Sequence, residues 1–141
     1  MVLDANILMR AVLGRRVRQI IETYSEHAAF FVPDVAFADA RRHLPDVVRK
    51  RGGDDATIAA TVELLAALSR NVDEVEAEAY VAHRRAALAR IEKRDPDDWP
   101  ILATAMALDC PVWTEDRDFF GAGVPAWTTD RVEIYLAEGE A

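Results

Sequence analysis

The segment MVLDANIL at residues 1–8 joins a short apolar run to a carboxylate, Asp4, after which apolar residues return at once. A short apolar run that ends at a polar residue predicts a buried strand. Ile7, Leu8 and Val12 then recur at helical spacing. The chain therefore opens with a strand and a helix, and an acid stands at their junction.

The same alternation of strand and helix continues along the chain. Further strands are predicted at residues 29–32, 72–75, 111–114 and 124–128, and helices between them and at 130–136. Strands that alternate with helices indicate an α/β fold, with a mostly parallel sheet covered by helices on both faces. The 141 residues suffice for one domain, and we expect a single domain over residues 1–141.

Two helices carry stripes of apolar or small residues that are expected to pack inward. The first stripe is Ile58, Val62, Leu65 and Leu68, and the second is Ala79, Ala82, Ala86 and Ala89. In the helix that starts at Asp34, Pro45 predicts a kink.

The bulk composition is 51% hydrophobic and 30% charged, as in soluble globular proteins. No apolar run approaches the roughly 20 residues that span a bilayer, and the N-terminal segment lacks the pattern of a secretory signal. Cys110 is the only cysteine, which excludes a disulfide framework and a thiolate metal site. A cytoplasmic location is expected by default.

Acids stand where predicted strands or loops meet helices: Asp4, Asp98 and Asp116, with Asp39 on the helix after the second strand. Right-handed crossovers would bring all four to the carboxyl edge of the sheet. Carboxylates that lie close together raise one another's pKa, and Mg²⁺ or Mn²⁺ relieves the repulsion. Singly, Asp98 could cap a helix, Asp116 could shape a turn, and Asp39 could be solvated.

Three segments carry a resemblance to a known family: LDANIL at 3–8, Asp98 with ATA at 103–105, and TEDRDF at 114–119. Their order and spacing resemble the motifs of the PIN-domain family, which includes VapC-like toxins of toxin–antitoxin pairs. The resemblance covers residues 2 to about 128. It implies a PIN-like three-layer α/β/α sandwich around a parallel sheet of about five strands. It also implies a Mg²⁺- or Mn²⁺-dependent endoribonuclease.

The resemblance also assigns roles by position. It makes Asp4, Asp98 and Asp116 metal-site acids, Asn6 and Thr114 residues that orient the first and last acid, and Asp118 an extra acid. Where the family usually has Glu, this chain has Asp39, one methylene shorter. Asp39 would bind a metal through water or weaken the site, and Asp34 is a less favoured substitute. The expected chemistry is in-line hydrolysis of a phosphodiester.

The sequence leaves three other functions open. A metal-free ribonuclease would use two of His27, His43 and His83 as acid and base. A metal-dependent phosphatase would use Asp4 as nucleophile, although it would be expected to have Asp where this chain has Asn6, and Lys50 and Lys93 are its only lysines. A PIN-like module without activity would bind RNA or a protein, and Asp39 in place of Glu is its best support.

The net charge of −8 argues against a nucleic-acid partner unless basic residues are clustered. Arg41, Arg42 and Arg49 follow Asp39 on the same predicted helix, and we hypothesise that they guide RNA to the acids, with a solvated helix face as an equal alternative. The toxin role adds an antitoxin as a possible partner, and many such toxins form homodimers.

Overall fold

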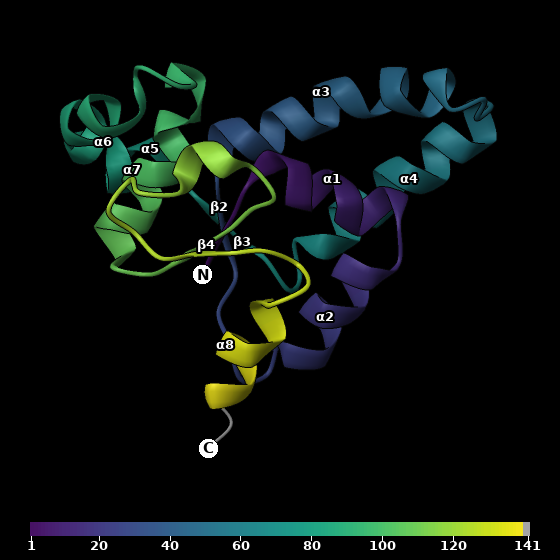
Figure 1. Cartoon of the computed structure of the whole chain (residues 1–141). Helices are drawn as coiled ribbons and strands as arrows, with labels where there is room; N and C mark the ends of the chain where they lie inside the picture. The colour runs from purple at the N-terminus through teal and green to yellow at the C-terminus, as the bar shows by residue number, and fades with distance from the viewer. Residues whose placement is uncertain (140–141) are drawn as a thin grey trace.

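A computed structural model describes residues 1–139, and its centre is a five-stranded sheet in the order β3-β2-β1-β4-β5 (Figure 1). Every neighbouring pair is parallel, as predicted. The last two residues of the predicted domain, 140 and 141, lie outside the described residues. The strands are β1 (Val2–Leu3), β2 (Phe31–Pro33), β3 (Asp73–Val75), β4 (Val112–Trp113) and β5 (Ala126–Trp127).

Helices cover both faces of this sheet, which confirms the predicted three-layer α/β/α sandwich (Figure 1). One layer holds α1 (Ala5–Leu13), α2 (Arg16–Tyr24), α3 (Asp34–Lys50) and α4 (Asp55–Leu68). The other layer holds α5 (Ala77–Tyr80), α6 (Arg84–Ile91) and α7 (Trp99–Leu108). The remaining elements are α8 (Val132–Glu138) and the 3-10 turns η1 (Val81–His83), η2 (Pro96–Asp98) and η3 (Arg117–Phe119).

The order of the strands places a switch point between β1 and β4. The chain moves from β1 outward to β2 and β3, and then returns through α5–α7 to place β4 on the other side of β1. Leu3 is paired with Trp113, so the next residues, Asp4 and Thr114, leave the sheet side by side. Ligands of open α/β sheets collect at such a point, beyond the carboxyl ends of the strands.

Trp113 anchors the β4 end of this switch point. Its side chain is fully buried and packs at a tilt against Phe30, with 6.3 Å between the ring centroids. Its indole Nε1 donates a hydrogen bond of 3.1 Å to the Thr129 hydroxyl. The core therefore holds the strand that leads into Thr114 and Asp116 in a fixed position.

The α3–α4 hairpin extends beyond the sheet (Figure 1). α3 runs through Pro45 without ending there, although proline removes one helical hydrogen bond. The turn after α3 uses Gly52 at a φ of +84°, a conformation that other residues adopt with strain.

Both predicted stripes are wrong in part. Ala79, Ala82, Ala86 and Ala89 are all exposed, because η1 interrupts the helix and changes its phase, so that Tyr80, Ala87 and Ile91 are buried instead. In α4, Val62 is 40% exposed and Thr61 is buried. Thr61 tolerates burial because its hydroxyl donates to the Thr57 carbonyl at 2.7 Å.

Membrane insertion has no candidate helix in residues 1–139, since none is both long and apolar enough to cross a bilayer.

Candidate active site

Asp4 is a buried carboxylate at the junction of β1 and α1. Only 3% of the residue is exposed, and its backbone conformation is extended, as required of the residue that caps α1. Its Oδ2 accepts a 2.7 Å hydrogen bond from the Thr114 hydroxyl, and its Oδ1 accepts a long one of 3.5 Å from the Asn6 backbone. Burial nevertheless raises the pKa of Asp4 above its ordinary value.

Thr114 links the first acid to the last. While its hydroxyl donates to Asp4, the same oxygen accepts a 2.9 Å hydrogen bond from the Asp116 backbone N–H. Asp116 Oδ1 in turn accepts from the Asp118 backbone at 2.9 Å and begins η3. One hydroxyl thus fixes the carboxylate after β1 and the loop after β4 at the same place.

Asp98 completes the group from the other helical layer. It lies at the end of η2 and precedes α7. Among the buried side-chain oxygens and nitrogens of residues 1–139, its Oδ2 is the one without a hydrogen-bond partner. Burial raises its pKa to about 7, and the charges of Asp4, Asp95, Asp116 and Asp118 add to this effect. Asp98 therefore lacks a compensating cation.

The donor set suits a hard divalent cation. All donors are carboxylate or hydroxyl oxygens, and the buried Asp98 oxygen has no partner. Within residues 1–139, no three His, Cys, Asp or Glu side chains are already arranged around a common ion position. This agrees with a Mg²⁺-type site, because Mg²⁺ keeps several waters and uses only one or two carboxylates.

The raised pKa of Asp98 predicts a pH-dependent effect of Asp98→Asn on stability. The pKa is about 7 in the folded protein against an ordinary 3.8, so the folded state binds the extra proton and loses stability as the pH rises between these values. At pH 8 in EDTA we expect the variant to melt about 3 °C above the parent, after allowance for screening by water. Near pH 4 the gap should close, which thermal melts across this range would measure; equal melting at pH 8 would contradict the argument.

Asp39 does not join these acids. It is exposed on α3, where its Oδ1 accepts a 2.7 Å hydrogen bond from Arg42. Its charge is not among those that raise the pKa of Asp98 or Asp4. The expectation that all four acids meet at one edge is thus met by Asp4, Asp98 and Asp116, with Asp118 beside them.

Asp34, the less favoured substitute, has a structural role instead. Its carboxylate accepts hydrogen bonds from the backbone of Val35 at 2.8 Å and of Ala77 at 3.2 Å, and from the Tyr80 hydroxyl. These contacts tie the start of α3 to α5. Burial, followed by the hydrogen bond to Asp34, raises the pKa of Tyr80, so this hydroxyl stays a donor.

Asn6 contacts Asp4 through its backbone and not through its side chain. The side chain is exposed on α1, and the backbone N–H makes the long contact to Asp4. The expected orienting role of Asn6 is therefore seen only as helix capping. Thr114, by contrast, contacts both acids at the switch point.

The three arginines proposed to guide RNA are already paired with acids. Arg41 lies 3.7 Å from Glu74 and over the Phe37 ring. Arg42 contacts Asp39, and Arg49 lies 3.6 Å from Asp46. These pairs favour the alternative that this face of α3 is simply solvated.

Arg94 is a contributor that the sequence patterns missed. Its Nη1 donates to the carbonyl oxygens of Arg117, Asp118 and Phe120 at 3.2, 3.0 and 2.7 Å. One guanidinium thereby ties the segment before Asp98 to the loop that carries Asp116 and Asp118. The position of Arg94 four residues before Asp98 was visible, but its carbonyl partners depend on the tertiary fold.

The structure gives little support to the other enzyme classes. His27, His43 and His83 lie on three separate elements: the α2–β2 loop, α3 and η1. Asp4 is nearly inaccessible and hydrogen-bonded, which disfavours it as the nucleophile of a phosphatase.

Comparison with known proteins agrees with this arrangement. A model of the PIN domain matches residues 2–137. The fold is similar to a chain in the crystal structure of VapBC2 from Rickettsia felis bound to a DNA fragment from their promoter. That similarity has a TM-score of 0.70 at 11% sequence identity and covers 90% of this chain and 96% of the other. Comparison with curated protein sequences gave no match.

Proposed function

The chain belongs to the PIN domain family, and on this basis we propose that it is an endoribonuclease that hydrolyses RNA phosphodiester bonds with Mg²⁺ or Mn²⁺. The observation that carries the proposal is the buried, unpartnered oxygen of Asp98 beside the charges of Asp4 and Asp116. A divalent cation is the partner that such a group lacks.

Asp98, Asp116 and Asp4 would hold the cation, with Asp118 near enough to affect its charge balance. When bound, Mg²⁺ or Mn²⁺ acts as a Lewis acid toward water and phosphate oxygens. Asp98 must lose its proton to bind, so binding is expected to strengthen as the pH rises through about 7.

The protein groups orient this chemistry. Thr114 holds the Asp4 carboxylate and the Asp116 backbone, so these acids keep their separation during a reaction. Asp4 also precedes α1 and Asp98 precedes α7, and the N-terminal ends of helices favour negative charge. Arg94 limits movement of the loop that bears Asp116.

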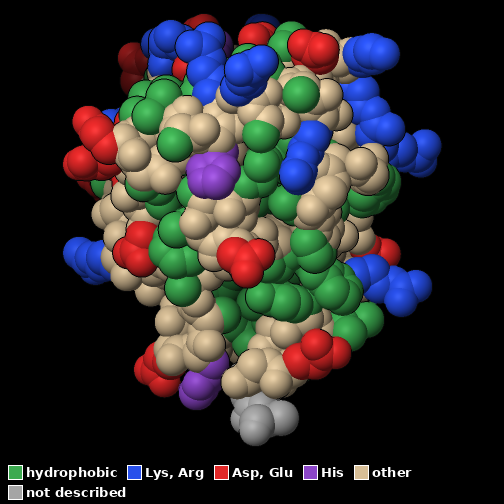
Figure 2. Space-filling view, turned by 90° about the vertical axis from the view of Figure 1, so that its left-hand side faces the viewer, with side chains coloured by type: hydrophobic (Ala, Val, Ile, Leu, Met, Phe, Trp, Pro, Cys, Tyr) green, Lys and Arg blue, Asp and Glu red, His purple; other side chains and the backbone are tan. Residues whose placement is uncertain are grey.

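The overall charge does not forbid an RNA substrate. Figure 2 views the side formed by α5–α7, and Lys and Arg side chains gather toward the top of the view, the end at which α3 lies in Figure 1. The net charge of −8 is therefore unevenly spread, and local basic groups can attract a polyanion.

A toxin role with an antitoxin partner is the finer proposal. It is supported by the likeness in fold to a chain of a VapBC2 structure, over 90% of this chain. A homodimer belongs to the same proposal.

The second candidate function is a PIN module that binds RNA or a protein without cutting. The specific observation in its favour is Asp39, which replaces the family's usual Glu and is engaged with Arg42. Such a module would retain affinity when its acids are neutralised.

The test is cleavage of a mixed pool of cellular RNA by the purified protein with Mg²⁺, with Mn²⁺ and with EDTA. We expect cutting with at least one of the metals and none in EDTA. Cutting that persists in EDTA would direct attention to the histidines. Folded protein that binds RNA but never cuts it would favour the binding module.

A further inference from the structure

A groove next to Asp116 carries positive charge that the fold does not neutralise. Its volume is about 760 Å³, against about 350 Å³ for the cavity beside His83 and Arg90. Asn6 and Asp116 lie in its wall, so the groove reaches the acids. The basic residues of the wall are Arg10, Arg15, Arg16 and Arg51.

The groove is built from three parts of the chain. Asn6, Met9, Arg10 and Leu13 share one face of α1 at helical spacing. Arg15 comes from the turn between α1 and α2, and Arg51 from the end of α3. Apolar side chains of Met9, Leu13, Val17 and Val47 lie among these charges. The wall thus alternates guanidinium groups with apolar surface.

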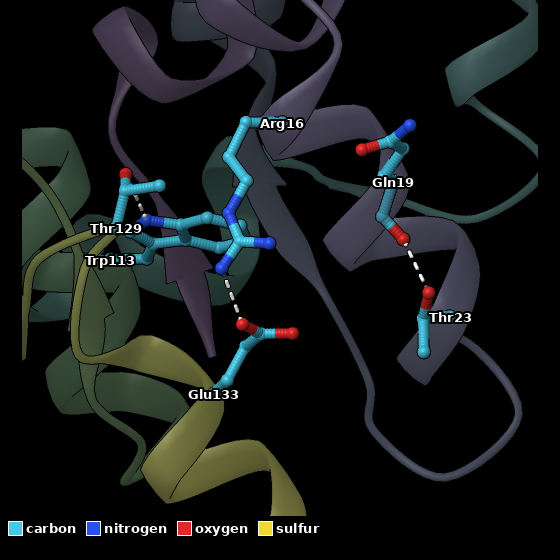
Figure 3. A network of polar contacts seen from close by, with 6 residues as sticks. All are labelled: Arg16, Gln19, Thr23, Trp113, Thr129 and Glu133. Atoms are coloured by element: carbon cyan, nitrogen blue, oxygen red, sulfur yellow. Dashed lines mark hydrogen bonds and ion pairs between the residues drawn. The ribbon is translucent and has the colours of Figure 1, made fainter.

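Arg16 is already neutralised by the fold. Figure 3 shows its guanidinium directed to Glu133 of α8, and the two side chains form an ion pair at 2.5 Å. The acid Glu115 is also engaged, because its carboxylate accepts a 2.7 Å hydrogen bond from the Thr129 backbone. These two groups belong to the framework of the groove.

Arg10, Arg15 and Arg51 differ from Arg16 in that no acid neutralises them. Within residues 1–139, none of the three makes an ion pair or a side-chain hydrogen bond, and all three are exposed. Arg41, Arg42 and Arg49, by contrast, each have an acidic partner. Three unpaired guanidinium groups on one groove of a protein with net charge −8 indicate a polyanionic ligand.

We propose that this groove binds the backbone phosphates of a single-stranded RNA segment that leads to Asp116 and Asp98. Guanidinium groups match phosphate oxygens in geometry and charge. The apolar side chains between them suit the faces of unpaired bases, which a duplex would hide. The identification of the strand as the substrate rests on the proposed ribonuclease function; the phosphate site itself does not.

The test measures binding apart from cleavage. Anisotropy of a fluorescein-labelled single-stranded RNA of about twelve nucleotides is recorded in EDTA for the parent and two triple variants. One variant is Arg10→Gln, Arg15→Gln and Arg51→Gln, and the matched control, with the same charge change, is Arg41→Gln, Arg42→Gln and Arg49→Gln. A third protein carries Lys at positions 10, 15 and 51, and thermal melts confirm that each is folded.

We expect the groove variant to bind at least about 10-fold more weakly and to lose about 2 from the slope of log affinity against log salt, since each single-strand phosphate contact contributes about 0.7. The control should bind as the parent does, and the Lys variant should recover most of the affinity. Equal losses in the two Gln variants, a loss in the control alone, or no RNA binding by the parent would overturn the proposal.

Two further readouts separate this proposal from others. Arginine-dependent binding without cleavage in Mg²⁺ would leave the groove in place and overturn the ribonuclease. Cleavage without any dependence on the three arginines would do the reverse. A poly-glutamate peptide that binds through these arginines while RNA does not would replace RNA with an acidic protein segment.

Discussion

Asp98→Asn is expected to lower the rate of Mg²⁺-dependent RNA cleavage by at least about 100-fold, since groups that merely orient a metal ligand already cost about 10–100-fold when removed. Asn keeps the size of the side chain but removes the negative charge. That charge is the one whose pKa is raised to about 7 and whose Oδ2 has no partner. Initial rates across a range of Mg²⁺ concentrations would show whether metal affinity or the maximal rate is affected.

The matched control is Asp97→Asn. Asp97 is the adjacent residue, is exposed, and carries the same charge. Its variant should cut within about 2-fold of the parent, because exposed charges contribute little to a site that they do not touch. Equal activity of Asp98→Asn and the parent would contradict the proposed role of Asp98, and equal loss in both variants would indicate a nonspecific charge effect.

Thr114→Val is expected to destabilise the fold by about 2–4 kcal/mol and to reduce cleavage strongly. Valine has nearly the same shape but no hydroxyl. The substitution leaves the buried Asp4 Oδ2 without its donor and the Asp116 N–H without its acceptor. An unsatisfied buried polar group costs about 1–3 kcal/mol, and two are created here. Urea denaturation would give the change in unfolding free energy.

Thr114→Ser separates the hydroxyl from the methyl group. Serine can keep both hydrogen bonds, so its cleavage should stay near that of the parent, with a stability loss of about 1 kcal/mol from the missing methyl. If Thr114→Val matched Thr114→Ser in both stability and cleavage, the bridging role of the hydroxyl would be wrong.

The sequence predicted those parts of the fold that depend on backbone position. Asp4 and Thr114 come at the ends of short apolar runs, and parallel strands must end at a common edge. The three-layer architecture and the proximity of Asp4, Asp98 and Asp116 follow from that constraint. The metal-binding roles of these acids stay predictions.

Side-chain partners across the tertiary structure were harder to predict. Arg41 contacts Glu74 of β3, and Arg94 contacts carbonyl groups of η3, so neither partner is close in sequence. The groove arginines were visible only as basic residues. What distinguishes Arg10 from Arg42 is the absence of an acidic neighbour in residues 1–139, and the folded structure alone shows this.

Helix phase was the other weak point. The alanines expected to pack in α5 and α6 are exposed because η1 breaks the periodicity. In α4, apolar residues surround the helix on several sides, so spacing alone did not identify the buried face.

The hydrogen bond between Thr114 and Asp4 joins residues that are 110 positions apart in the chain. During synthesis, Asp4 leaves the ribosome early, but its partner and Asp116 emerge only after nearly all the helices have been made. The acids therefore cannot gather on a nascent chain until residue 116 is free to pair with the first strand. A ribonuclease built in this way stays inert while it is still attached to the messenger RNA and ribosome that produce it.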